Sequence, residues 1–268
     1  MIPTLLTDSV TPNLERALYY TLLWGLEGVE LRSVGGPHDR VPNVNERKLR
    51  GQLLDADMPV VAIAPGMFEG DPNDRATWLN ELASFDETLA FCERIDCPRV
   101  VISGFRGRIE TESDVRHDAI LEIVADPIRR AAARAGERGI EVCISNDATS
   151  IIRTGEHLNR LLATVGDRSA MAAWNPMEAM MAREHPVDGI DALAGRIGLV
   201  RCSNGIQVGN GWEPRTIDRG AIEWADQIDR LRRMSFDGPV SLEIRVDPGP
   251  KSGLRESMAL IDLLRTVR

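Results

Sequence analysis

Short apolar runs rich in branched residues alternate with longer amphipathic stretches along the whole chain, and this alternation constrains the fold more than any other feature. The apolar runs have the length and composition of buried strands, and the longer stretches have the helical period. The expected strands are residues 2–6, 28–32, 58–64, 99–103, 141–147, 170–174, 197–202 and 238–245. The expected helices are residues 11–24, 44–56, 78–95, 112–138 with a break near Pro127, 155–165, 187–194, 222–234 and 254–267.

Eight strand–helix units of this kind predict one closed barrel. Strands that alternate with helices pair in parallel through crossover connections. Eight units in 268 residues, with no linker or low-complexity segment between them, favour a (β/α)8 TIM barrel over an open doubly wound sheet. No Gly-x-Gly-x-x-Gly pattern follows the first expected strand, which argues against dinucleotide binding. We therefore expect residues 1–268 to form a single α/β domain.

Charge and composition narrow the classes of partner. A formal net charge of −9 argues against a nucleic-acid backbone, which needs a basic face. No apolar run approaches the roughly 20 residues that span a bilayer, and the start of the chain lacks the features of a signal peptide. The cysteines show no C-x-x-C spacing, so reduced core thiols are expected. We expect a cytoplasmic protein with a small polar substrate and neither a nucleic-acid nor a membrane partner. Whether it forms a homo-oligomer is left open.

The last expected strand carries charges at its far end. Residues 238–245 open with Gly-Pro, and side-chain alternation places Ser241, Glu243 and Arg245 on one face. In a (β/α)8 barrel, the C-terminal ends of the strands hold the residues that do chemistry. The alternative is an edge-strand glutamate that pairs with its neighbouring arginine.

The other strand ends also supply polar side chains. They are Glu30, Arg32, Glu69, Arg106, Ser145, Asn146, Asp147, Asn175, Glu178, Arg201 and Asn204. Arginines gathered at one mouth suit a planar anion such as a carboxylate or phosphate, which a guanidinium binds through two hydrogen bonds. Two alternatives stay open: Arg106 as a solvated loop charge, and Glu30 as a member of an internal ion pair instead of an acceptor for a substrate hydroxyl.

Five short stretches resemble the sugar phosphate isomerase/epimerase family, the xylose isomerase-like TIM barrels. They are residues 28–34, the pair Ser145-Asn146, residues 174–176, residues 220–224 and residues 240–243, and the resemblance covers nearly the whole chain. It implies a TIM barrel that moves a proton next to a carbonyl in a sugar, sugar phosphate or sugar acid. A metal-dependent nuclease of similar fold is disfavoured by the acidic charge and the missing histidines.

The resemblance also implies a divalent metal, held by Glu, Asp, His and Glu at the ends of strands five to eight. We assign these positions to Ser145, Asn175, Arg201 and Glu243, of which only the last matches. A hard cation needs several oxygen anions, and a guanidinium among its ligands repels it. We therefore predict no metal, with Arg201 neutralising Glu243 and polarising a substrate oxygen. The alternative is weak Mg²⁺ or Mn²⁺ binding at Asp147, Glu178 and Glu243, with Glu30 as a further ligand.

The sequence thus predicts an isomerase- or epimerase-like barrel in which Glu243, Arg201 and Glu178 are the catalytic residues. The predicted substrate-binding residues are Glu30, Arg32, Arg106, Ser145, Asn146, Asp147, Asn175, Asn204 and Arg245. The hydroxyl of Ser145 is not a base of useful pKa. A mechanism in which two carboxylates transfer the proton therefore lacks one of them. The alternative is a metal-free barrel that binds a polar anion without turnover or serves as a non-catalytic subunit.

Overall fold

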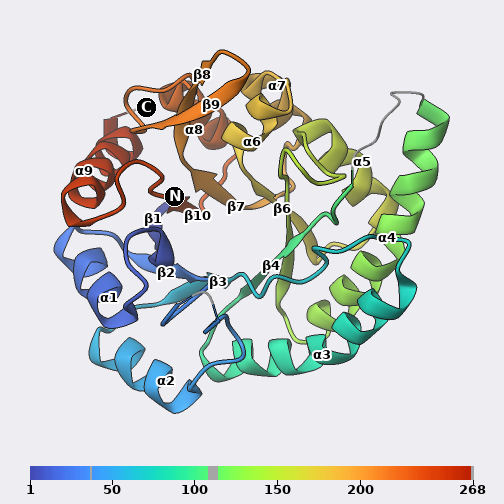
Figure 1. Ribbon diagram of the computed structural model, residues 1–268, viewed down its shortest axis with the longest axis horizontal. Helices are drawn as coiled ribbons and strands as arrows, with labels where there is room; N and C mark the ends of the chain where they lie inside the picture. Colours follow the sequence, from blue (N-terminus) through green and yellow to red (C-terminus); the bar gives the residue numbers. More distant parts are fainter. Residues whose placement is uncertain (37, 108–113, 267–268) are drawn as a thin grey trace.

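Eight parallel strands close into a barrel, as the alternation predicts (Figure 1). The computed structural model describes residues 1–36, 38–107 and 114–266, except for the side chains of residues 114–118. In barrel order the strands are β1 (Ile2–Leu6), β10 (Pro239–Leu242), β7 (Ile197–Cys202), β6 (Ala170–Trp174), β5 (Glu141–Ser145), β4 (Arg99–Ser103), β3 (Val60–Ile63) and β2 (Gly28–Leu31). Each strand lies beside its neighbour in sequence around the barrel, and β10 closes it against β1.

Helices surround the barrel on the outside (Figure 1). They are η1 (Thr7–Ser9), α1 (Leu14–Leu23), α2 (Glu46–Asp55), α3 (Arg75–Arg94), α4 (Asp114–Gly136), α5 (Gly155–Val165), α6 (Pro176–Met181), α7 (Pro186–Ala192), α8 (Trp224–Arg233) and α9 (Pro250–Thr266). Side-chain caps fix several starts: Asn13, Asn45 and Asp74 each accept a hydrogen bond from a backbone N–H of the first turn. No helix in the described part of the chain is long and apolar enough to cross a membrane.

The expected break at Pro127 is wrong, because α4 continues through it to Gly136. Proline removes one backbone donor, which normally disfavours the interior of a helix. Here Val124, Ala125 and Ile128, on both sides of the proline, are fully buried. Burying this apolar face stabilises the helix enough to offset the lost hydrogen bond. The expected start at residue 112 lies outside the described residues.

The segment after β7 is a hairpin, where we expected a loop rich in Gly and Asn. Its strands, β8 (Asn204–Val208) and β9 (Gly211–Arg215), pair antiparallel with Ile206 opposite Glu213. A two-residue connection that begins with Gly209, at φ +58°, is a hairpin signal that sequence reasoning missed. The short helix α6, after Asn175, was also not expected.

The core has two layers. The larger one lies between the strands and the helices. The smaller one fills the barrel with inward side chains that include Val61, Val101, Cys143 and Leu199. All four cysteines are free and buried, as expected for core thiols. The apolar side chains inside the barrel come from β3 to β7. The polar side chains of Glu30, Arg201 and Ser241 occupy the side of the interior near β2, β7 and β10.

Candidate functional site

A buried ion pair spans the interior of the barrel. Arg201 of β7 donates from Nε to Oε1 of Glu30 at 3.2 Å, and its Nη2 also contacts that carboxylate. Ser241 of β10 donates its hydroxyl to the other oxygen of Glu30 at 2.7 Å. Burial disfavours a charged guanidinium, but the attraction of Glu30 outweighs it and raises the pKa of Arg201. Of the two alternatives for Glu30, the structure shows the internal ion pair, with Arg201 as the partner.

A second ionic cluster lies just beyond the end of β10. Nη2 of Arg245 donates to Oε2 of Glu243 at 2.8 Å and to Oε1 of Glu178 at 2.9 Å. Glu178, in α6, also accepts from the backbone N–H of Ala148 at 3.1 Å. Burial by itself would raise the pKa of Glu243, but Arg245, Arg201 and Arg32 outweigh it and hold this pKa below its usual value. Glu243 is therefore ionised at neutral pH.

The expected pairing of Arg201 with Glu243 needs correction. The guanidinium that binds Glu243 directly belongs to Arg245, while Arg201 binds Glu30. Arg201 still acts on Glu243 through its charge. The reason is geometric: Arg245 is two residues from Glu243, just beyond the end of β10, whereas Arg201 lies in β7, level with Ser241, and extends across to Glu30 of β2. Glu243 thus pairs with its neighbouring arginine, as in the alternative stated for this strand, although β10 has a strand on each side and is not an edge strand.

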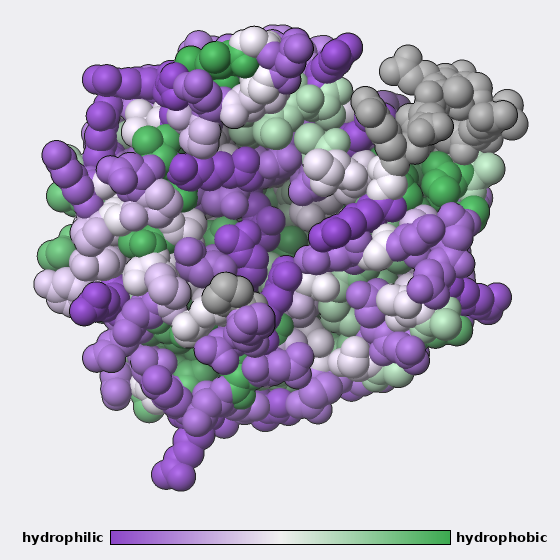
Figure 2. Space-filling model, viewed as in Figure 1, coloured by the Kyte–Doolittle hydropathy of each residue, from purple (hydrophilic) through white to green (hydrophobic). Residues whose placement is uncertain are grey.

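A cavity of about 270 Å³ opens at the mouth. Its lining is mostly polar: Arg32, Arg40, Ala64, Gly66, Glu69, Val101, Ile102, Ser103, Arg106, Ser145, Asp147, Thr149, Ser150 and Arg201. Five predicted site residues therefore meet in it: Arg32, Arg106, Ser145, Asp147 and Arg201. Glu243 and Glu178 are not lining residues. Glu243 lies behind Arg32, whose Nη1 is 3.8 Å from its Oε1. Figure 2 shows hydrophilic residues gathered around the hollow at the centre of this face.

Three predicted binding residues have structural roles instead. Asn146 donates to the carbonyls of Asn175 and Arg153 and accepts from the N–H of Asn175. Asn175 caps α6, and Asn204 holds the segment after the hairpin. Each is at most 3% exposed. Because their amides already bond to backbone groups, we leave all three out of the proposed substrate contacts.

Two of the lining residues, at and just after the end of β5, already form hydrogen bonds within the protein. The Ser145 hydroxyl donates to the carbonyl of Ile102 at 3.1 Å. Asp147 accepts from the N–H and the hydroxyl of Thr149 at 2.7 and 2.6 Å. Both of these bonds to Asp147 end on Oδ1, so Oδ2 makes no hydrogen bond with the described residues and remains available to a ligand.

Sequence reasoning missed Arg40 and Asp8. Arg40 lines the cavity and pairs with Glu69 at 3.0 Å. Asp8, in η1, pairs with Nε of Arg32 at 2.9 Å. Neither was among the predicted candidates, although loops after the strands had supplied others, such as Glu69 and Arg106. The available signal was position: each lies in the segment that directly follows a strand.

The residues at the positions expected for metal ligands do not fit a divalent cation. Ser145 and Asn175 offer neutral oxygens that already hydrogen-bond within the protein, and Arg201 is itself a cation. The rearranged alternative also fails, because Arg245 lies between Glu178 and Glu243 and binds both. Among the described residues, no group of three or more His, Cys, Asp or Glu is arranged to hold a metal. We derive no step through a metal.

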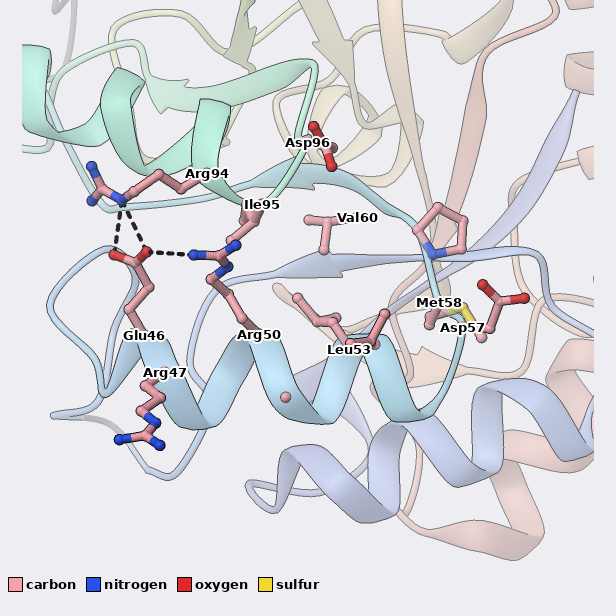
Figure 3. Close-up of a pocket in the computed structure, with 13 residues that line it drawn as sticks. Glu46, Arg47, Arg50, Leu53, Asp57, Met58, Val60, Arg94, Ile95 and Asp96 are labelled. Carbon is pink, nitrogen blue, oxygen red and sulfur yellow. Dashed lines mark hydrogen bonds and ion pairs between the residues drawn. The ribbon is translucent and has the colours of Figure 1, made fainter.

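A larger cavity, of about 840 Å³, lies at the opposite end of the barrel (Figure 3). It is bounded by α2, the start of β3 and the end of α3. Its basic residues are partly neutralised: Glu46 binds Arg94 at 2.9 Å and lies 3.9 Å from Arg50. Chemistry in these barrels occurs at the C-terminal ends of the strands. We therefore place the functional site at the smaller cavity.

Comparisons with known proteins agree with this architecture. A family model described as xylose isomerase-like TIM barrel matches residues 20–264. The solved structure of IolI protein with a bound zinc atom is 14% identical, with a TM-score of 0.82, and the match covers 100% of this chain and 99% of that one. For L-ribulose 3-epimerase the identity is 16%, the TM-score 0.78 and the coverage 100% and 95%.

A third structure, a xylose isomerase-like TIM barrel/4-hydroxyphenylpyruvate dioxygenase fusion protein, is 16% identical with a TM-score of 0.81. The match covers 98% of this chain but only 42% of the fusion protein. No protein of curated function matches the sequence. At these identities the structural matches establish the fold alone.

Proposed function

The chain belongs to the xylose isomerase-like TIM barrel family, and we propose that it isomerises or epimerises a sugar, sugar phosphate or sugar acid by moving a proton next to a carbonyl. The observation that carries the proposal is the ionised carboxylate of Glu243, at the C-terminal end of β10, among the guanidinium groups of Arg245, Arg201 and Arg32. The shared fold with L-ribulose 3-epimerase supports the same class of reaction.

In this mechanism the substrate extends from the cavity past Arg32 to Glu243, whose Oε1 is 3.8 Å from Nη1 of Arg32. The Glu243 carboxylate removes the proton from the carbon beside the carbonyl. The electrons of that C–H bond form the C=C bond of an enediolate, and the carbonyl oxygen takes the negative charge. Arg201 and Arg32, which line the cavity, stabilise that oxygen by charge, because a guanidinium stays protonated. The lowered pKa makes Glu243 a weak base, so the rate depends on how well the oxyanion is stabilised.

The number of carboxylates bears on the outcome of the reaction. A single base returns the proton to the face from which it came, which suits aldose–ketose interconversion. Inversion at one carbon needs a second group on the opposite face. Arg245 holds Glu178 beside Glu243, and not opposite it, so this pair of carboxylates suits aldose–ketose interconversion better than inversion.

Solvent deuterium incorporation tests the proposal. The protein is incubated in D₂O with aldoses, ketoses and their phosphates and acids, with and without Mn²⁺, and exchange is followed by NMR. We expect exchange that Glu243→Gln lowers by at least about a hundredfold, the range for loss of a general base. Glu213→Gln, in an exposed ion pair with Arg215, is the matched control and leaves the rate unchanged. Absence of exchange with every compound contradicts the proposal.

A second candidate function is binding of a polar anion without turnover. In favour of this function, each carboxylate of the two ionic clusters already has an arginine partner. The partner is Arg201 for Glu30, and Arg245 for Glu178 and Glu243. Under this alternative, calorimetry shows ligand binding while no compound exchanges deuterium.

We also propose a cytoplasmic location. The support is that all four cysteines are buried and free, and that burial raises the pKa of the Cys143 and Cys202 thiols. Cysteines that form no disulfides are typical of reducing compartments.

A further inference from the structure

The cavity at the mouth carries an excess of positive charge in an acidic protein. Four arginines line it against two carboxylates, Glu69 and Asp147, while the whole chain has a formal charge of −9. We propose that two of these arginines, Arg40 and Arg106, bind a carboxylate or phosphate group of the substrate, so that the protein takes an anionic sugar derivative in preference to a neutral sugar. This rests on the proposed function in one respect, that the mouth cavity is the substrate site.

The other two arginines already have carboxylate partners outside the lining. Arg201 binds Glu30, which is fully buried. Arg32 binds Asp8 at 2.9 Å and lies 3.8 Å from Glu243. Their charges are largely balanced from within, so they are better suited to polarising a substrate oxygen than to holding a full negative charge. The task of binding an anion falls to Arg40 and Arg106.

The guanidinium of Arg40 is held in place before any ligand arrives. Its Nε donates to the carbonyl of Ala64 at 3.2 Å, and its Nη2 donates to Glu69 at 3.0 Å. The group lies against the backbone of Gly66, where an added Cβ would be only 2.3 Å from Cζ of Arg40. Its Nη1 has no hydrogen bond to the described residues. A fixed guanidinium with a free donor loses little entropy when it binds an oxyanion.

Glu69 occupies part of the same guanidinium in the free protein. Its side chain is 40% exposed and that of Arg40 is 36% exposed, so the pair is partly solvated. Such partly solvated pairs contribute little to stability. A carboxylate or phosphate entering the cavity competes with Glu69 for Arg40 at little cost. Glu69 thus acts as an internal substitute for the ligand's anionic group.

Arg106 supplies the second positive charge. Two backbone contacts fix its main chain. Its N–H donates a hydrogen bond to the carbonyl of Gly70 at 2.9 Å, and it forms an isolated antiparallel β-bridge with Ser150. Its side chain forms no ion pair with any carboxylate in the described ranges. An exposed arginine on a fixed backbone at the rim of a cavity gives an incoming anion a partner that needs no displacement.

The size of the cavity fits a small ligand. Its volume of about 270 Å³ is just below the roughly 300–1,000 Å³ typical of sites for drug-sized molecules. A monosaccharide acid or phosphate is therefore favoured over a nucleotide or an oligosaccharide.

Calorimetry with matched ligands tests the proposal. D-Gluconate and D-glucose 6-phosphate carry the anionic group, and D-glucose is the neutral counterpart. We expect at least one of the two anions to bind tenfold or more tightly than D-glucose, with an affinity that falls as salt rises. Arg40→Met weakens that binding by about tenfold or more, the range for hydrogen bonds to charged groups, and Arg106→Met also weakens it. Glu69→Gln strengthens it, because the internal competitor is gone.

Gly66→Ala provides a further test, because the new methyl group displaces the Arg40 guanidinium. Gly66 has φ +77°, so alanine also strains its backbone. Gly139→Ala is the matched control: it has φ +69° and nothing within 4 Å of the added Cβ. We expect only Gly66→Ala to lose anion affinity.

Equal affinity for D-glucose and both anions, or unchanged anion affinity in Arg40→Met, overturns this inference while leaving the proposed proton transfer intact. Tight anion binding through Arg40 with no deuterium exchange in any compound has the opposite meaning. It supports the inference and contradicts the proposed activity.

Discussion

One nitrogen of Arg245 lies between two carboxylates, 2.8 Å from Glu243 and 2.9 Å from Glu178. This is the position that a divalent cation takes between two acidic ligands. A guanidinium supplies the charge permanently and is fixed in direction, so it cannot polarise a substrate by direct coordination. At the scale of single residues, Arg245 therefore determines which chemistry is open to the site.

Removing that guanidinium is expected to create a metal site. In Arg245→Ala, Glu178 and Glu243 lose the counter-ion that they share, which favours a divalent cation. Millimolar Mn²⁺ should raise the Tm of the variant by several degrees, as a ligand at about 100 times its Kd adds roughly 2.7 kcal/mol. Differential scanning fluorimetry measures the effect.

The control is Arg215→Ala, which removes only the exposed ion pair with Glu213. Neither it nor the unaltered protein should respond to Mn²⁺. A Tm rise of the same size in the unaltered protein would show that Arg245 does not exclude the ion.

Among the elements, the hairpin of β8 and β9 is tied to the segment that follows it by the side chain of Asn204. The Asn204 amide donates to the carbonyls of Ile217 and Ile222 and accepts from the N–H groups of Gly205 and Ile222. Gly220 has to be glycine, because an added Cβ would be 2.0 Å from Oδ1 of Asn204. The hairpin and the segment after it thus depend on a contact that no strand ladder provides.

Asn204→Ala is expected to loosen this segment and to lower the unfolding free energy by about 2–4 kcal/mol, since it leaves buried backbone groups without partners. Hydrogen exchange should accelerate over residues 205–222 and remain slow in β10. Gln207→Ala, which removes only an exposed 3.4 Å contact with Gly209, is the control. Uniform acceleration across the barrel would mean that Asn204 supports the whole fold, not this segment.

For the whole molecule, a buried carboxylate couples stability to pH. Glu256 of α9 accepts from the N–H of Ile217 at 3.2 Å, and its Oε1 is buried without a partner. Burial, opposed by that hydrogen bond and assisted by Asp218, raises the pKa of Glu256 to about 7. The helix that closes the barrel is therefore tied to the loop after the hairpin through a group that titrates near neutrality.

The sign of the effect follows from proton binding. Between pH 4.5, the ordinary value, and about 7, the folded protein holds this proton and the unfolded chain does not. The unfolding free energy therefore falls as pH rises through this window, by about 3 kcal/mol at most, since each tenfold difference in proton affinity is worth about 1.4 kcal/mol. The lowered pKa of Glu243 acts in the opposite direction and at lower pH.

Urea unfolding at pH 5 and pH 8 measures this effect. We expect Glu256→Gln to be more stable than the unaltered protein at pH 8 and to lose most of the decrease between the two values. Glu27→Gln, at an exposed position, should change neither. An unchanged pH profile in Glu256→Gln would contradict the assignment.

The sequence by itself determined the barrel, its eight strands and most of its helices. Strand and helix patterns are local, so a short apolar stretch carries the information for its own structure, although β10 covers only Pro239–Leu242 of the expected strand 238–245. It also located Glu243, Arg201, Ser145 and Asp147 at one end of the barrel, because the ends of parallel strands meet at one mouth. Where local patterns compete with packing, as at Pro127 in α4, sequence reasoning failed.

Only the tertiary structure decided which charges pair. Arg201 finds Glu30 across 171 positions of sequence, and Arg245 finds Glu178 across 67. The amides of Asn146, Asn175 and Asn204 are occupied by backbone groups, and Arg40 enters the cavity from a loop. Hydrogen bonds and ion pairs depend on distance and direction in space to within an ångström. The spacing of residues along the chain shows the periodicity of the strands and helices, but it does not show the geometry of side-chain contacts.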